Sequence, residues 1–172
     1  MTKEPSINGL KLSEPLIAIW VHEEDQTVDR LSLFCRLLAK TEINIAFMTS
    51  TSVIDSQPAL CCIDPKDQAV AAEWIERSEE LAGSVRFGGS VGVITFYPHH
   101  FSLKLMGLAL QVFSQNGIRV YGMASSIAAL SFVVDSDRLE DAGRLLTKTF
   151  ALPANVSPPK SDFRVRQERR PL

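Results

Sequence analysis

Residues 43–48 have the sequence Ile-Asn-Ile-Ala-Phe-Met, and residues 118–123, 75 positions further on, have the sequence Ile-Arg-Val-Tyr-Gly-Met. The same shift, without a gap, places the apolar run at residues 17–21 on the run at residues 92–96. After these segments the shift falls to 71 positions, which gives the first copy a longer hairpin. A repeat of this length indicates one structural unit built twice.

Both copies predict the same order of elements. An apolar strand and a polar loop lead into a helix whose apolar residues are spaced i, i+3 and i+4, so that they form one buried stripe. Two more strands precede a second helix, and the first copy ends in a short closing strand. The expected strands cover residues 16–21, 43–48, 59–63 and 84–87 in the first copy and about 91–96, 118–123 and 127–134 in the second; the expected helices cover about residues 28–40, 64–80, 103–116 and 138–149. In residues 43–48, alternation places Ile43, Ile45 and Phe47 on one face and Asn44, Ala46 and Met48 on the other.

This order of elements is the split βαβ of ferredoxin-like folds, so the sequence predicts an α+β protein with two such units in tandem. The second copy lacks a good closing strand, because residues 152–159 are rich in proline. Residues 7–12 form a spare strand, and we expect this N-terminal strand to complete the second unit. The predicted domains are residues 1–13 for the N-terminal strand, 14–88 for the first unit, 89–152 for the second unit and 153–172 for a basic, flexible tail.

Charge and composition exclude some classes of partner. The 172 residues contain 18 Lys and Arg against 20 Asp and Glu, so no overall positive field is present to hold nucleic acid. The apolar runs are far shorter than the ~18–20 residues of a membrane helix. The three cysteines have no Cys-x-x-Cys spacing, which is typical of reduced thiols. We therefore expect a cytoplasmic protein with no nucleic-acid partner and no membrane partner.

Three stretches of the chain carry a family resemblance: residues 43–48, residues 116–126 (Asn-Gly-Ile-Arg-Val-Tyr-Gly-Met-Ala-Ser-Ser) and residues 130–135 (Leu-Ser-Phe-Val-Val-Asp). They resemble the ACT domains, and in particular the tandem ACT pair at the regulatory end of aspartate kinases. The strand at residues 7–12 is similar to the strand that precedes the paired domains in those kinases. The resemblance covers residues 6–151 and includes no kinase domain.

The resemblance implies a regulatory function. ACT domains usually bind small molecules, most often amino acids, and report the binding to an attached or associated enzyme. The chain is expected to be a stand-alone regulatory protein and not an enzyme, because it has no glycine-rich phosphate loop and no acid/base or nucleophile constellation. ACT pairs typically join side by side, so the resemblance also implies a homodimer. Because ACT domains report binding to an enzyme, it implies a partner enzyme as well.

In the first copy, a ligand is expected between the first loop and the second strand. The acidic loop around Glu23 suits an ammonium group, and Asn44 offers both a donor and an acceptor. Thr27 has an alternative role as a helix cap, and the alternative for the acidic loop is a solvated turn. The candidate ligand-binding residues of this copy are Glu23, Glu24, Asp25, Gln26, Thr27, Val28, Asn44 and Ile45.

In the second copy, Arg119 is the residue that can bind a carboxylate through two parallel hydrogen bonds. Aromatic and histidine side chains of the first loop can line the ligand pocket. The alternative for Arg119 is a surface or dimer-interface position. The candidate residues of this copy are Tyr97, His99, His100, Phe101, Arg119 and Val120.

Both copies depart from the family pattern. ACT domains usually have a glycine where the first loop meets its helix, and this glycine lets a ligand carboxylate approach backbone N–H groups. Neither residues 22–27 nor residues 97–101 contain one, and Arg119 replaces a usual Asn. The alternative function is therefore an ACT module for dimerisation or interaction that binds no ligand.

No catalytic residue, metal site or cofactor is expected. His99 and His100 are adjacent, so their side chains point apart, and Cys61 and Cys62 have the same geometry on a strand. Trp20 and Trp74 lie in apolar elements and are expected in the core.

Overall fold

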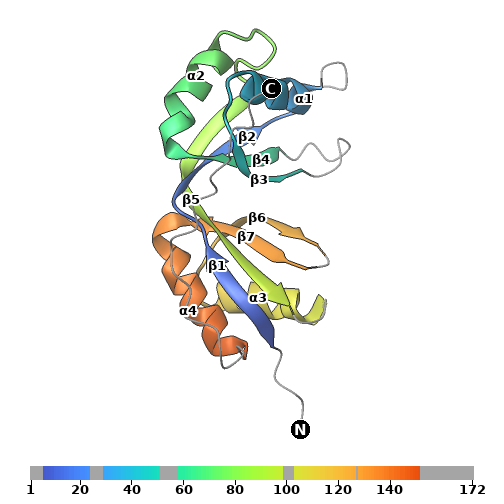
Figure 1. The fold of residues 1–172 in the computed structure, drawn as a ribbon, viewed down its shortest axis with the longest axis vertical. Coiled ribbons are helices and arrows are strands. Elements are labelled where there is room, and N and C mark those ends of the chain that lie inside the picture. The colour runs from blue at the N-terminus through green and yellow to red at the C-terminus, as the bar shows by residue number, and fades with distance from the viewer. Residues whose placement is uncertain (1–5, 24–28, 51–57, 99–102, 127, 152–172) are drawn as a thin grey trace, which may run out of the picture.

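The structure, a computed structural model, describes residues 6–23, 29–50, 58–98, 103–126 and 128–151 (Figure 1). Its elements follow the predicted order, and the strands expected at residues 7–12, 16–21 and 59–63 have the expected bounds. The elements are β1 (Ile7–Leu12), β2 (Leu16–Val21), α1 (Arg30–Lys40), β3 (Ile45–Thr49), β4 (Ala59–Ile63), η2 (Pro65–Asp67), α2 (Gln68–Glu76), β5 (Val85–Pro98), α3 (Leu103–Gln115), β6 (Val120–Ser125), β7 (Leu130–Asp135), η3 (Ser136–Arg138) and α4 (Leu139–Thr149).

The strands of the described chain form one antiparallel sheet, which the long strand β5 divides into two halves. The first part of β5 pairs with β2, and the half-sheet continues through β4 to β3. The second part of β5 pairs with β7, which pairs with β6, while β1 takes the other edge of β5 at residues 94–98. The orders β3-β4-β2-β5 and β6-β7-β5-β1 are those of two ferredoxin-like units. The predicted fold class is confirmed, with the N-terminal strand in the second unit.

Strand β5 is longer than the sequence predicts. Two strands are expected at residues 84–87 and 91–96, but the intervening Gly88 and Gly89 lie inside the single strand Val85–Pro98. A Cβ at residue 88 would lie 3.1 Å from Nε1 of Trp20, so this glycine makes room for a side chain of the neighbouring strand β2. The two units therefore share a strand.

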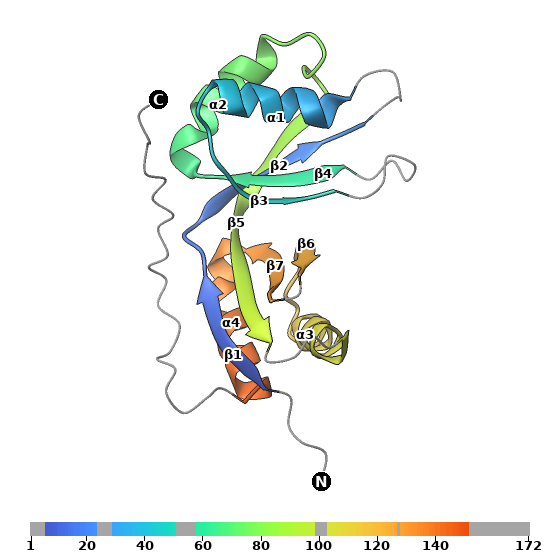
Figure 2. The ribbon, with the colours of Figure 1, turned by 45° about the vertical axis from the view of Figure 1, so that its right-hand side comes forward.

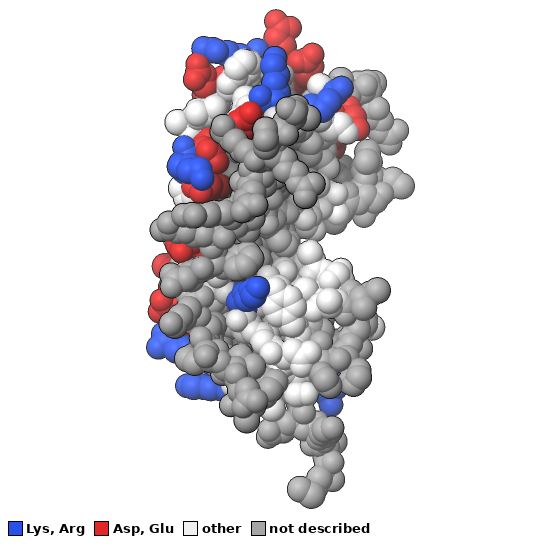
Figure 3. Space-filling view, in the orientation of Figure 1, with Lys and Arg blue, Asp and Glu red and all other residues white. Residues whose placement is uncertain are grey.

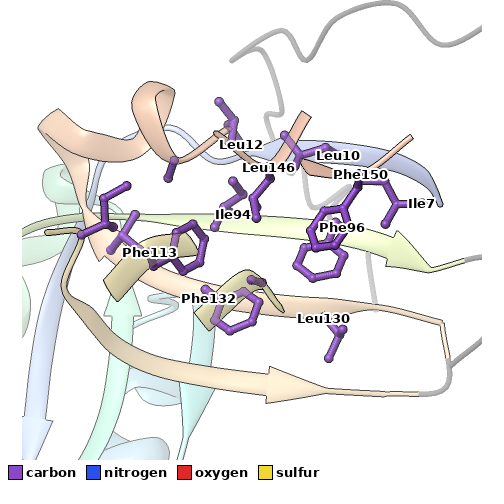
Figure 4. Packing of buried hydrophobic residues seen from close by; sticks show 14 of the residues in the cluster. Ile7, Leu10, Leu12, Ile94, Phe96, Phe113, Leu130, Phe132, Leu146 and Phe150 are labelled. Carbon is purple, nitrogen blue, oxygen red and sulfur yellow. The ribbon is translucent and has the colours of Figure 1, made fainter. Parts of the chain in front are cut away.

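Helices cover one face of each half-sheet: α1 and α2 in the first unit, α3 and α4 in the second (Figures 1 and 2). The core beneath α3 and α4 is built on aromatic rings (Figure 4). The ring of Phe132 stacks on that of Phe96 at 5.8 Å between centroids and meets Phe113 edge-on at 5.4 Å. Such pairs add ~0.5–1.5 kcal/mol each beyond the area that they bury.

Strand β1 belongs to this second core. Its residues Ile7, Leu10 and Leu12 are 0%, 7% and 5% exposed and point toward the aromatic cluster (Figure 4). A Cβ on Gly143 of α4 would lie 3.4 Å from Leu12, so the helix packs closely against the strand. The strand thus supplies the apolar face that the second copy lacks in its own span.

The helix-free faces of the two halves pack against each other in a smaller cluster, which we call the seam. Its buried members are Leu16, Ala18, Phe47, Leu60, Cys62, Val91 and Val133, and the half-buried Trp20, Val93 and Tyr121 pack against them. At the seam, Gly122 of β6 in the second unit lies against the side chains of Leu60, Thr49 and Phe47 of the first unit.

A bulge in each edge strand turns residues toward the seam. The register of β3 shifts between Ile45 and Phe47, and that of β6 shifts between Val120 and Gly122, at equivalent positions of the repeat. The prediction that Phe47 shares a face with Ile45 is wrong: Ile45 packs against the core under α1, and Phe47 enters the seam. The inserted residue of a bulge reverses the alternation of faces.

The two tryptophans differ in burial. Trp20 is half-buried at the seam, but Trp74 on α2 is 36% exposed, so the expectation of a core position is wrong for Trp74. The ring of Trp74 lies 5.3 Å from Nζ of Lys40 and 5.9 Å from the Arg77 guanidinium carbon. These cations explain how an aromatic ring is accommodated at the surface.

The described surface has a mixed charge pattern. On the face in Figure 3, charged side chains of both signs gather over the unit that holds α1 and α2, whereas the front of the other unit is largely uncharged. Within the described ranges, no helix has the length and apolar character needed to cross a membrane.

Candidate functional site

Six of the candidate ligand-binding residues lie in the described part of the chain: Glu23, Asn44, Ile45, Tyr97, Arg119 and Val120. The other eight lie outside the described residues: Glu24, Asp25, Gln26, Thr27, Val28, His99, His100 and Phe101. Asn44 and Arg119 occupy equivalent places, each exposed just before its edge strand.

Glu23 lies directly at the start of helix α1. Its Oε1 accepts a hydrogen bond from the Leu31 N–H at 2.9 Å, and its Oε2 accepts one from the Arg30 N–H at 3.3 Å. Backbone N–H groups at a helix start have no partner within the helix and favour negative charge. The carboxylate of Glu23 therefore occupies a place that suits an anion.

Asp29 takes the remaining donors of this helix start. Its side chain accepts from the N–H of Ser32 at 2.9 Å and from the Ser32 hydroxyl at 2.6 Å, and its backbone carbonyl accepts from the N–H of Leu33 at 3.1 Å. The hydroxyl of Ser32, and then its N–H, hold the pKa of Asp29 below the ordinary value. Residues of the chain itself thus satisfy the first four N–H groups of α1, and the cap is Asp29.

The described candidates of the first unit do not lie together. Glu23 follows the end of β2 at Val21, which pairs with Ala59, whereas Asn44 precedes β3, whose Ile45 pairs with Ile63 at the other end of β4. The four steps along the strand between these ends span about 13 Å. One small ligand therefore does not contact both Glu23 and Asn44 within this unit.

The second unit shows the same separation. Arg119 precedes β6, whose Val120 pairs with Val134 of β7, and Val134 pairs with Gly92 of β5. Tyr97 is five positions further along β5, or about 16 Å. Its ring lies instead 5.7 Å from Nζ of Lys11 on β1.

Arg119 belongs to a cluster at the margin of the seam. Its guanidinium carbon lies 5.8 Å from the centroid of the Tyr121 ring, and the Tyr121 hydroxyl donates a 2.7 Å hydrogen bond to Oδ1 of Asp135. The Tyr121 ring also meets Trp20 of the first unit at 6.3 Å between centroids. The hydrogen bond to Asp135 is the first cause that raises the pKa of Tyr121, and burial is the second.

Sequence reasoning missed Tyr121, Asp135 and Trp20 as members of this cluster. Tyr121 and Asp135 each lie in a stretch that carries the family resemblance, so the sequence did draw attention to both segments. Their contact depends on the bulge in β6, which has no signal in the sequence pattern.

The cysteines do not form a reactive site. Cys61 and Cys62 are fully buried, and burial raises the pKa of each thiol to about 12. A thiol with so high a pKa is a poor nucleophile at neutral pH. In the part of the chain that the structure describes, no group of three or more His, Cys, Asp or Glu side chains is placed to hold a metal ion.

Comparison with known proteins gives structural similarity only. No family model matches the sequence, and no curated protein matches it. The solved structures that match include the ligand-free regulatory subunit of aspartate kinase from Thermus thermophilus, with a TM-score of 0.71 and 14% identity over 84% of this chain and 99% of that chain. The regulatory subunit of aspartate kinase from Thermus flavus has a TM-score of 0.67 and 14% identity over 86% of this chain and 99% of that chain.

A third match is a complete enzyme. Aspartokinase III from E. coli in complex with lysine and aspartate has a TM-score of 0.64 and 15% identity over 88% of this chain and 34% of that chain. The chain therefore has the fold of the regulatory part of aspartate kinases, as the resemblance predicts, and corresponds in extent to a separate regulatory subunit.

Proposed function

We propose that this chain is a non-catalytic regulatory module that binds a small effector, in the first place an amino acid, and modulates an associated enzyme. The observation that carries the proposal is the structural match to a free-standing regulatory subunit of aspartate kinase over 99% of its length. The unpaired cysteines Cys35, Cys61 and Cys62 are compatible with the cytoplasm, where we expect the protein to act. We also propose that it forms a homodimer.

The described residues favour one end of the second unit for the effector. Of the six described candidates, Arg119 is the cationic one, and its exposed guanidinium can take a carboxylate as a bidentate partner. At the start of α1, by contrast, Glu23 and Asp29 already occupy the N–H groups that a ligand carboxylate would need. We therefore propose Arg119 as the partner of the effector's carboxylate.

The second candidate function is an interaction module without a ligand. It is favoured by the same helix start, since the chain satisfies these donors by itself in the first unit. Under this alternative the edge strands β3 and β6 serve only to hold partner chains.

The test of the proposed function is a thermal-shift screen of the full chain against all proteinogenic amino acids, with lysine, aspartate, threonine and arginine first. An effector at 100 times its dissociation constant adds about 2.7 kcal/mol to the free energy of unfolding, which raises the melting temperature by several degrees. Arg119→Gln should remove this shift, while Lys148→Gln, an equal charge change on the exposed side of α4, should retain it. No shift with any amino acid at millimolar concentration would favour the interaction module.

A further inference from the structure

The cluster at the margin of the seam is a continuous chain of contacts between the two units. Arg119 and Tyr121 belong to the second unit, and the ring of Tyr121 meets Trp20 on β2 of the first unit. Trp20 also packs against the shared strand β5, because a Cβ added at Gly88 would lie only 3.1 Å from Nε1 of Trp20. The Tyr121 ring is therefore in contact both with the Arg119 guanidinium and with Trp20 of the other unit.

We propose that Arg119, Tyr121 and Trp20 form a relay that reports to the first unit whether a carboxylate is bound at Arg119. Arg119 is a positioning residue for the Tyr121 ring in the unbound protein, through the attraction of a guanidinium to an aromatic face. A carboxylate that pairs with the guanidinium competes for it, since a bidentate pair fixes the plane of the group. The ring then loses one of the contacts that set its place against Trp20.

Asp135 defines how the ring can respond. The 2.7 Å hydrogen bond from the Tyr121 hydroxyl to Asp135 fixes the far end of the side chain, so a change at Arg119 alters the tilt of the ring and not its place along β6. The ring planes of Trp20 and Tyr121 are now inclined by 58°. Next to this contact, Gly122 packs closely against Leu60 and Thr49, which gives the relay an immediate path into β4 and β3.

The inference deepens the proposed function and rests on it for the nature of the effector. The relay itself is independent of the effector's identity, because removal of the Arg119 charge must reach Trp20 even without a ligand. Coupling is also reciprocal, so a carboxylate that favours one position of the Tyr121 ring must bind more tightly to the protein with the ring in that position.

The experiment follows the fluorescence of Trp20 in the full chain with Trp74→Phe, which leaves Trp20 as the single tryptophan. Arg119→Gln should shift the emission of Trp20, and this shift should vanish when Tyr121→Leu is also present. Tyr121→Phe keeps the ring but removes its bond to Asp135, so Arg119→Gln should still shift the emission in this background, which guards against a folding defect of the Leu variant. Lys148→Gln is the control of equal charge change and should leave the emission unaltered.

Sodium acetate is the probe for the carboxylate, with sodium chloride at the same ionic strength as its reference. Acetate should give a saturable change in Trp20 emission that Arg119→Gln removes, and Tyr121→Leu should change the acetate dissociation constant by about fivefold or more. An unaltered Trp20 emission in Arg119→Gln would overturn the relay. If Arg119→Gln alters the emission but acetate does not, Arg119 is in contact with Trp20 through Tyr121 but reports no carboxylate, and the proposed relay fails. If acetate alters the Trp20 emission but no amino acid raises the melting temperature, the proposal of an amino-acid effector fails and the relay stands.

Discussion

At the scale of single residues, Gly122 decides how closely the two units meet. A Cβ at this position would lie 2.8 Å from Cδ2 of Leu60 and 3.0 Å from Cγ2 of Thr49, so Gly122→Ala forces these two side chains to shift within the seam. We expect a loss of about 1–3 kcal/mol in the free energy of unfolding, measured by urea denaturation. The matched control is Gly107→Ala on the exposed side of α3, where a Cβ meets nothing within 4 Å and should stabilise the helix by up to ~1 kcal/mol. An equal effect of the two substitutions would contradict this account of the seam.

Tyr121 makes the free energy of unfolding depend on pH in the alkaline range. Its pKa is raised above 10.0, chiefly by the hydrogen bond to Asp135, because that bond needs the protonated hydroxyl. The stabilisation is fully present below the pKa of an unfolded tyrosine, about 10, and is lost as the pH rises through the higher pKa of the folded protein. Tyr121→Phe should therefore cost about 1 kcal/mol at pH 8.

The check is the difference in unfolding free energy between the natural chain and Tyr121→Phe, followed from pH 8 to pH 11.5. This difference should shrink as the pH rises. A constant difference over this range would mean that the hydroxyl contributes nothing through Asp135.

At the scale of elements, β1 is a distant segment that completes a core. Leu12 is 5% exposed and packs against α4, so Leu12→Ala should cost about 2–5 kcal/mol in unfolding free energy, measured by urea denaturation. Glu14→Ala, two residues on and exposed, is the control and should stay within about 0.5 kcal/mol. A small effect of Leu12→Ala would mean that the second unit does not depend on the N-terminal strand.

Elements were also the scale at which the sequence was most informative. The repeat and its periodicity predicted the order of the helices and strands, with β5 expected as two strands, and the missing closing strand of the second copy identified the role of β1. The bulges in β3 and β6 and the continuity of β5 were not predictable, because they depend on which side chains meet across the seam. For the same reason the pattern identified Arg119 as a candidate but not its contacts with Tyr121, and it placed Glu23 in a loop without its bonds to α1.

At the scale of the whole molecule, the free edges of the sheet support the proposed homodimer. Among the described strands, β3 pairs only with β4 and β6 pairs only with β7, so each half-sheet ends in an edge with unpaired backbone groups. Proteins normally cover such edges. Sedimentation equilibrium at tens of micromolar should give twice the mass of the chain, and a single-chain mass would exclude the dimer at that concentration.

The position of β1 in the second unit also bears on how the protein is made. The ribosome synthesises β1 before the rest of the described chain, but its partners in β5 and α4 follow much later, out to residue 149. At ~5–20 residues per second, the interval is on the order of ten seconds. During this time the apolar face of Ile7, Leu10 and Leu12 lacks part or all of its native partners, although the first unit's own helices are already complete. The nascent chain therefore carries an exposed apolar strand until β5 and α4 have been made, and β1 is the kind of segment to which a chaperone for extended apolar chains binds.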